Sequence, residues 1–258
     1  MHQKQPPAKM AVFVSALAVA RLAKTTVTTK VRNLDMVRTR SDSSWDLFHE
    51  RHQPSGTLGD KESVPDAVEF VPTDYFAPLD LPEVFPRPGL LEVDLGCGDG
   101  SFLVAMAQKA PDRNYLGIER MFGRVRSACA RASRASVTNV RLLRVEISYA
   151  VKYLIPANST SAAHLLFPDP WPKKRHQRRR IVTADFVAAV HRILVPDGFF
   201  NVATDQPDYF ASICELIPNS GFREVSTERN ADFPLTTFQK RFLTAGAPIY
   251  RLALRKTV

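Results

Sequence analysis

The chain has 258 residues, 45% of them hydrophobic, and its formal net charge is +9 at pH 7. This length accommodates one large α/β domain with an extension, and the basic balance favours an anionic partner such as nucleic acid. The three cysteines lie far apart and show neither a disulfide framework nor zinc spacing, so we expect a reducing compartment and no metal.

The N-terminal part of the chain contains a short apolar run, residues 10–20, which follows Lys4 and Lys9. Three interpretations fit it: a weak signal-peptide core, a transit peptide, or an upstream start codon with the working start at Met36. The run is too short to span a bilayer as a helix. Because the rest of the chain is of an intracellular type, we favour an extension or upstream start and predict a cytoplasmic protein without a membrane anchor.

From Gly89 onwards the pattern alternates between strands and helices. The predicted strands are Leu90–Leu95, Asn114–Ile118, Val140–Val145, His164–Phe167, Phe199–Ala203, Phe222–Ser226 and Ile249–Leu254. The predicted helices are Ser101–Lys109, Met121–Ala135, Ile147–Leu154, Thr183–Leu194 and Pro207–Ile217. Such an order indicates an α/β fold with a doubly wound seven-stranded sheet, closed by an antiparallel pair. We assign residues 1–63 to an N-terminal extension and 64–258 to the folded domain.

A glycine-rich loop follows the first predicted strand and reads Asp94-Leu95-Gly96-Cys97-Gly98-Asp99-Gly100. Position 101 is Ser, so the loop departs from the G-x-G-x-x-G pattern that cradles a pyrophosphate. An acid two residues before the first glycine suits a cofactor that carries positive charge, such as S-adenosylmethionine. Glu119 ends the second predicted strand, where a carboxylate bonds ribose hydroxyls in nucleotide-binding folds.

The most unusual segment follows the apolar residues His164–Phe167. Pro168 and Pro170 frame a single carboxylate, Asp169, at a strand end where open α/β sheets bind ligands. Six cations come next, within eight residues: Lys173, Lys174, Arg175, Arg178, Arg179 and Arg180. We predict a polar reaction centre beside a surface for nucleic-acid phosphates. The alternatives are a turn-capping role for Asp169 and a merely solvated helix start for the cations.

The chain resembles the tRNA (guanine-N7-)-methyltransferase family over roughly residues 75–258. The segments that carry the resemblance are Phe167–Ile181, Asp94–Gly100, Gly117–Glu119, Ala203–Asp205 and Thr236–Phe238 with Pro248–Tyr250. The resemblance implies a Rossmann-like class I methyltransferase fold and an enzyme that moves a methyl group from S-adenosylmethionine to N7 of the variable-loop guanosine of tRNA.

The same resemblance implies roles for individual residues. The cofactor site would hold Asp94, Gly96, Gly98, Gly100, Glu119, Glu146 and Asp169. The substrate would meet Lys173, Asp205, Thr236 and Gln239, and the tRNA backbone would meet Lys174, Arg175, Arg178, Arg179 and Arg180. The chain departs from the family's usual residues at Asp94, where Glu is frequent, at Glu146, where Asp is usual, and at Gln239, where Glu is usual.

Guanine N7 has a free lone pair, so its methylation requires no general base. We therefore expect catalysis by alignment and electrostatics, with Asp169 orienting the guanine and offsetting the positive charge that develops on it. Two other functions remain open: a methyltransferase that acts on amino groups of DNA or protein, and a non-catalytic RNA-binding protein on the same fold. We expect tRNA as the partner, and a monomer or weak homodimer.

Overall fold

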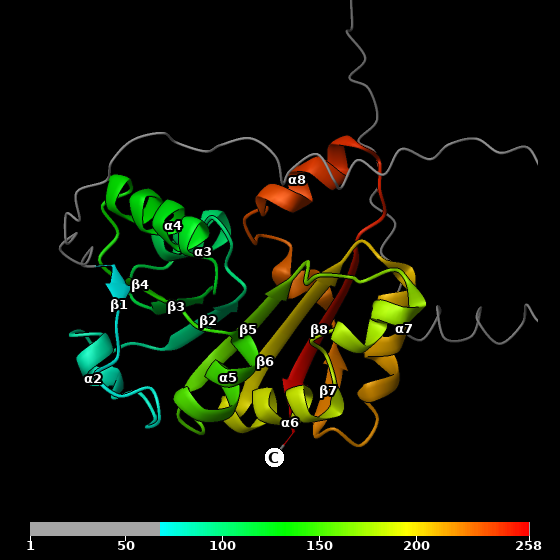
Figure 1. Ribbon diagram of the computed structural model, residues 1–258, viewed down its shortest axis with the longest axis horizontal. Coiled ribbons are helices and arrows are strands. Elements are labelled where there is room, and N and C mark those ends of the chain that lie inside the picture. Colours follow the sequence, from blue (N-terminus) through cyan, green and yellow to red (C-terminus); the bar gives the residue numbers. More distant parts are fainter. Residues whose placement is uncertain (1–67, 258) are drawn as a thin grey trace, which may run out of the picture.

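The computed structural model describes residues 68–257, which form one eight-stranded sheet with helices on both faces (Figure 1). The predicted extension, residues 1–63, lies outside the described residues. The strands are β1 (Glu69–Phe70), β2 (Leu91–Leu95), β3 (Asn114–Ile118), β4 (Val140–Leu143), β5 (Thr160–Leu166), β6 (Leu194–Thr204), β7 (Phe222–Val225) and β8 (Tyr250–Lys256). The longer helices are α3 (Ser101–Lys109), α4 (Phe122–Arg134), α6 (Ala184–Ile193), α7 (Pro207–Leu216) and α8 (Thr237–Thr244).

The strands follow the order β1-β4-β3-β2-β5-β6-β8-β7. Only β8 runs antiparallel to its neighbours β6 and β7, so the predicted doubly wound sheet with a final antiparallel pair is confirmed. The eighth strand, β1, precedes the first predicted strand and was not among the seven that the sequence pattern predicts. It pairs Glu69 and Phe70 with β4 and then ends, because Pro72 follows and proline has no N–H for a sheet ladder.

The structure also shows helical segments that the sequence pattern did not predict. These are α2 (Leu81–Val84), the 3₁₀ turn η3 (Lys174–Arg179), the 3₁₀ turn η4 (Thr227–Asn230) and α8. The predicted helix over 147–154 forms as α5 (Ile147–Tyr149), which continues as the π-helical turn η2 (Ala150–Leu154). Strand β6 begins earlier than predicted, at Leu194, because the Pro196-Asp197-Gly198 turn is accommodated as a bulge within the strand.

The two faces of the sheet carry separate hydrophobic clusters. On one face, residues of η2, α6 and α7 pack against Leu91, Val93 and Leu95 of β2. On the other face, α3 and α4 pack against β3 and β4, through side chains such as Phe102 and Val125. Each such side chain contributes roughly 1.5–3 kcal/mol when fully buried, so this sandwich fixes the strand ends that carry the site.

Strand β2 alternates its side chains between these faces, and its acids, Glu92 and Asp94, are both buried. Glu92 Oε2 lies 2.9 Å from His164 Nε2 on β5, and His164 Nδ1 lies 3.3 Å from the Asn201 amide nitrogen on β6. An amide donor at Nδ1 places the imidazole proton on Nε2, facing the carboxylate. Burial alone would raise the pKa of Glu92, but His164 and Arg113 hold it below its ordinary value. This polar row ties together the three strands that end at the candidate site.

Candidate active site

Four of the predicted site acids gather at one edge of the sheet. Strands β2, β3, β5 and β6 are parallel to one another and therefore end at the same edge. Asp94 is the second-to-last residue of β2, Glu119 directly follows β3, and Asp169 and Asp205 follow β5 and β6. The structure thus brings together acids from the first predicted strand, Asp94, to the fifth, Asp205. They lie at the edge where α/β sheets bind ligands.

The glycine loop is shaped by three residues with positive φ angles: Gly96 at 87°, Gly98 at 56° and Gly100 at 72°. The backbone N–H groups of Gly96 and Cys97 both donate to the Ile118 carbonyl, at 2.8 and 3.0 Å. A Cβ on Gly100 would come within 2.8 Å of the Ala128 Cβ on α4, whereas a Cβ on Gly98 would meet nothing within 4 Å. Gly100 therefore permits helix packing, and Gly98 leaves open space above the loop.

Two nearly buried carboxylates lie beside this loop. Asp94 and Glu119 are 3% and 5% exposed. Burial, together with the negative charge of Glu119, raises the pKa of Asp94 to about 7. Glu119 Oε1 accepts from the Met121 N–H at 2.9 Å, and its Oε2 lies 3.7 Å from Arg124. Asp94 receives no hydrogen bond from any residue in the described range, so its carboxylate remains available for a cationic ligand.

Asp99 joins three elements, a role that the sequence pattern did not indicate. Its Oδ1 accepts from the Ser101 N–H at 3.1 Å. Its Oδ2 accepts from Arg131 of α4 at 2.8 Å and from the Thr237 hydroxyl of α8 at 3.1 Å. Partial burial would raise the pKa of Asp99, but the bonds from Ser101, Arg131 and Thr237 lower it below its ordinary value. The only local signal was the Asp-x-Ser spacing at a helix start.

Helix α8 lies between the glycine loop and the turn after β5. At its first residue, Thr237 donates to Asp99, and near its end the Phe242 ring lies 5.3 Å from the ring of Phe167. The two predicted substrate residues here have structural partners: Thr236 caps the helix by accepting from the Gln239 N–H at 2.9 Å. Both are nearly buried, at 9% and 8% exposure. The T-x-x-Q capping pattern was the readable signal for this helix.

The turn after β5 holds Asp169 on a strained backbone. Phe167 and Trp171, on either side of it, have φ angles of 56° and 43°, which β-carbon-bearing residues rarely adopt. The Phe167 N–H donates to the Ala203 carbonyl at 2.8 Å and anchors the turn to β6. Asp169 itself is exposed, and no side-chain hydrogen bond joins it to the described part of the chain, which disfavours the turn-capping interpretation. Strain of this kind is concentrated at functional sites.

Asp205 and Glu146 bond to neighbours within their own loops. Asp205 is half-buried and accepts from the Gln206 side-chain amide at 2.7 Å. The N-cap of α7 is Gln206, and no side chain caps that helix. Glu146 follows β4, is exposed, and caps α5 through the Tyr149 N–H at 2.9 Å. Both nevertheless lie at the carboxyl edge of the sheet.

Five of the six predicted cations face solvent. Lys173 precedes η3, and the other exposed members within it are Lys174, Arg175, Arg178 and Arg179. The Arg179 guanidinium lies 5.0 Å from the centre of the Trp171 ring, and the His176 ring meets the same indole edge-on. Trp171 thus packs against η3 and positions its cations beside the Asp169 turn.

Arg180 differs from the other cations: it is buried, so its predicted contact with the tRNA backbone does not fit the structure. It is 9% exposed. Its guanidinium donates to the Pro170 carbonyl at 2.9 Å, to Ser212 at 3.2 Å and to the Asp208 carboxylate, and it lies over the Tyr209 ring. Arg180 therefore fastens the Asp169 turn to α7 and has no free face for a phosphate.

Within residues 68–257, no group of three or more His, Cys, Asp or Glu side chains is placed to hold a metal ion. No helix in the same range has both the length and the apolar character needed to cross a membrane.

Comparison with known proteins gives a consistent family. Residues 89–252 match the family model described as "Putative methyltransferase". The chain is 37% identical to a tRNA (guanine-N(7)-)-methyltransferase of Sodalis glossinidius, over 72% of this chain and 81% of that protein. It is 32% identical to a protein of the same name from Geobacter metallireducens, over 72% of this chain and 91% of that protein.

Among solved structures, the chain is similar to the antibiotic-resistance methyltransferase Kmr, at 17% identity and a TM-score of 0.49, over 69% of this chain and 92% of that chain. The family match covers the glycine loop and all of the acids at the sheet edge. On these grounds the chain belongs to the tRNA (guanine-N7-)-methyltransferase family of methyltransferases.

Proposed function

We propose that this protein transfers a methyl group from S-adenosylmethionine to N7 of a guanosine in the variable loop of tRNA. One observation carries the proposal. Asp169 is an exposed carboxylate without a partner in the described chain, held by a strained turn at the same sheet edge as the glycine loop. The names of the curated relatives support the substrate, and we place the reaction in the cytoplasm, where tRNA is abundant.

The residues around the glycine loop fit S-adenosylmethionine. When bound, this cofactor supplies an electrophilic methyl group on a positively charged sulfur. Asp94 is buried without a hydrogen-bond donor from the described chain, and a cationic amino group or sulfonium would compensate its charge. Glu119 lies at the end of β3 for ribose hydroxyls, and Gly98 leaves room for the ligand to approach the backbone. Glu146, at the end of the next strand, would meet the adenine side.

The residues of the β5 turn suit the guanine. N7 attacks through its lone pair, so the protein does not need to remove a proton before transfer. Asp169 holds the base in line and offsets the positive charge that grows on the ring as N7 is alkylated. The backbone of the turn that carries Asp169 is anchored through the Phe167 N–H and the Arg180 guanidinium, which fixes the position of this residue at the sheet edge. Lys173, Asp205, Thr236 and Gln239 complete the proposed substrate contacts.

The exposed cations of η3 supply the contacts to the tRNA backbone. Arginine matches phosphate geometry with paired N–H donors, and cationic surfaces of this kind provide much of the affinity for nucleic acid. Lys174, Arg175, Arg178 and Arg179 are exposed and lie beside the Asp169 turn. The proposed role places phosphates next to the nucleotide that is modified.

The test is methyl transfer from labelled S-adenosylmethionine to unmodified tRNA, with the site mapped by strand cleavage at N7-methylguanosine. We expect Asp169→Ala to lower kcat by about 10²–10³-fold, the usual effect of losing one preorganised electrostatic group. The matched control is Asp112→Ala, an exposed acid at the opposite edge of the sheet.

Cofactor and tRNA binding should persist in Asp169→Ala, because the glycine loop and the cations remain. Wild-type protein that binds both ligands but transfers no label would sink the enzymatic proposal and leave a binding role. Label at an exocyclic amino group would redirect the proposal to a different methyltransferase activity.

A further inference from the structure

A second arginine-rich region lies outside η3, on and around helix α4. Residues 120–145 contain seven arginines and no lysine, aspartate or glutamate. Three of these arginines are exposed on α4 itself: Arg124, Arg126 and Arg134. A helix of this kind usually interleaves acids with bases, which removes self-repulsion between like charges. Residues 120–145 contain no acid that could offset the repulsion between these arginines.

Acids elsewhere in the described chain compensate only part of this charge. Asp99 pairs with Arg131 at 2.8 Å, Glu119 approaches Arg124 at 3.7 Å and Glu69 approaches Arg144 at 3.5 Å. Arg126 lies over the Phe122 ring at 5.7 Å and has no carboxylate partner in residues 68–257. Arg134 likewise forms no ion pair within that range. These two guanidinium groups remain free to bind an anion.

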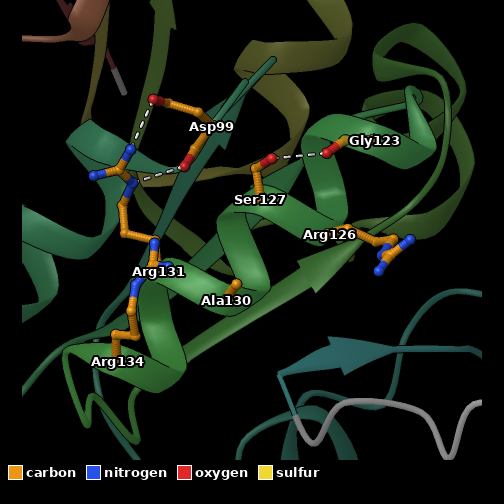
Figure 2. Close-up of a pocket in the computed structure, with 7 residues that line it drawn as sticks. All are labelled: Asp99, Gly123, Arg126, Ser127, Ala130, Arg131 and Arg134. Carbon is orange, nitrogen blue, oxygen red and sulfur yellow. Dashed lines mark hydrogen bonds and ion pairs between the residues drawn. The ribbon is translucent and has the colours of Figure 1, made fainter. Parts of the chain in front are cut away.

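The free arginines border a surface depression of about 520 Å³ on the outer side of α4. Figure 2 shows Arg131 and Arg134 projecting on one side of it and Arg126 on the other. The floor between them consists of small residues, Gly123 and Ala130 among them. This arrangement leaves space for a chain of phosphates between two sets of guanidinium donors.

Asp99 links the depression to the candidate active site. Asp99 lines the depression, and its Oδ2 also accepts from Thr237 of α8. The far end of α8 contacts the Phe167 ring in the turn that leads to Asp169 and η3. Contacts therefore run from α4 through the glycine loop and α8 to the Asp169 turn and η3. Cationic surfaces thus lie on both sides of the proposed target nucleotide.

We propose that Arg126 and Arg134, with the depression between them, form a second backbone-binding surface for the same tRNA, away from the modified guanosine. The inference rests on the proposed function, since it takes tRNA as the substrate. A folded RNA is much wider than one nucleotide site, and a second backbone contact would fix its orientation over α8. The chemistry is phosphate recognition by arginine without base readout.

The experiment compares full-length wild-type protein with the double variant Arg126→Ala/Arg134→Ala. We expect the Kd for unmodified tRNA to rise about 10- to 100-fold at physiological salt. The slope of log Kd against log salt should fall by about 1.4–1.8, because the variant makes two fewer phosphate contacts and its binding therefore releases fewer counterions. The kcat at saturating tRNA, the cofactor Kd and the Tm should stay unchanged.

The matched control is Lys152→Ala/Arg223→Ala, which removes the same charge from exposed positions on η2 and β7. Equal losses in both double variants would show a net-charge effect and overturn the proposal. An unchanged Kd and salt slope in Arg126→Ala/Arg134→Ala would also overturn it, and an acidic protein would then be the remaining candidate ligand for this surface. Because binding is measured without transfer, an inactive wild type would contradict the proposed function and still test this inference.

Discussion

At the scale of single residues, Asp94 links the stability of the protein to its ligand. Its pKa is about 7 in the folded chain, against an ordinary value of 3.8. The folded state therefore binds a proton more tightly than the unfolded state between these values. Stability of the ligand-free protein should fall as pH rises from about 4 to about 7 through this group, and stay level above that.

The variant Asp94→Asn removes this dependence. At pH 8 we expect the free energy of unfolding of the ligand-free variant to exceed that of wild type by roughly 1–4 kcal/mol, with a correspondingly higher Tm. Near pH 4 the two proteins should differ little. The Kd for S-adenosylmethionine should rise at least about tenfold, because Asn carries no charge for the ligand's cation. Thermal unfolding from pH 4 to 8 and calorimetric titration measure the two effects. A variant that is less stable than wild type at pH 8 would contradict the argument.

The residues found from the sequence were those whose role is set by local spacing. Asp94 lies near the end of β2, and Gly96–Gly100 and Glu119 directly follow strands, whose ends are readable from apolar runs. The role of Asp99 was not readable, because its partners Arg131 and Thr237 lie 32 and 138 residues away. The burial of Arg180 was not readable for the same reason: its partner Asp208 lies 28 residues away, on α7.

At the scale of elements, the turn after β5 depends on Arg180 for its attachment to α7. We expect Arg180→Ala to destabilise the protein by about 2 kcal/mol, below the usual 3–5 kcal/mol for a buried pair, because the Asp208 side chain is 50% exposed. The neighbouring variant Arg178→Ala removes an exposed cation and should leave the Tm unchanged while weakening tRNA binding.

Denaturant unfolding and tRNA titration of the two variants separate these roles. Equal stability of Arg180→Ala and wild type would contradict a structural role. A Tm loss in Arg178→Ala would show that η3 as a whole, rather than Arg180 alone, holds the turn.

The core strands and helices were predictable because long apolar periodicities identify them. Strands β2 and β3 and helix α3 begin and end within one residue of their predicted bounds. Helix α8 was missed because its residues are mostly polar and exposed; it is held by Thr237 and Phe242, through partners in distant loops. Strand β1 was missed because two residues carry no periodicity, and only the edge of β4 defines it.

At the scale of the whole molecule, the domain boundary near residue 64 stays a prediction. A chain that begins at residue 64 should fold with a Tm within about 2 °C of the full chain and bind cofactor equally well, because it retains β1 and its pairing with β4. A chain that begins at residue 73 loses β1 and the packing of Phe70, and should have a lower Tm. Calorimetry of the three proteins decides this. A large Tm loss on removing residues 1–63 alone would place part of that segment in the folded domain.

The order of strands in the sheet required the structure, since sequence periodicity identifies strands but not their neighbours. The position of β8 between β6 and β7 is an example: the sequence pattern indicated a final antiparallel pair, and the pairing of Leu252 with Val202 places β8 between β6 and the edge strand β7.

The reversed direction of β8 also determines how the protein can be attached to a support. Tyr250 pairs with Thr204 at the edge that carries the candidate site, and Arg255 pairs with Phe199 towards the opposite edge. The chain therefore leaves the sheet on the side away from α8, as the C-terminal mark in Figure 1 indicates. Immobilisation through residues added after the C-terminus would present the edge that carries the candidate site to the solution, a suitable geometry for single-molecule measurement of tRNA residence times.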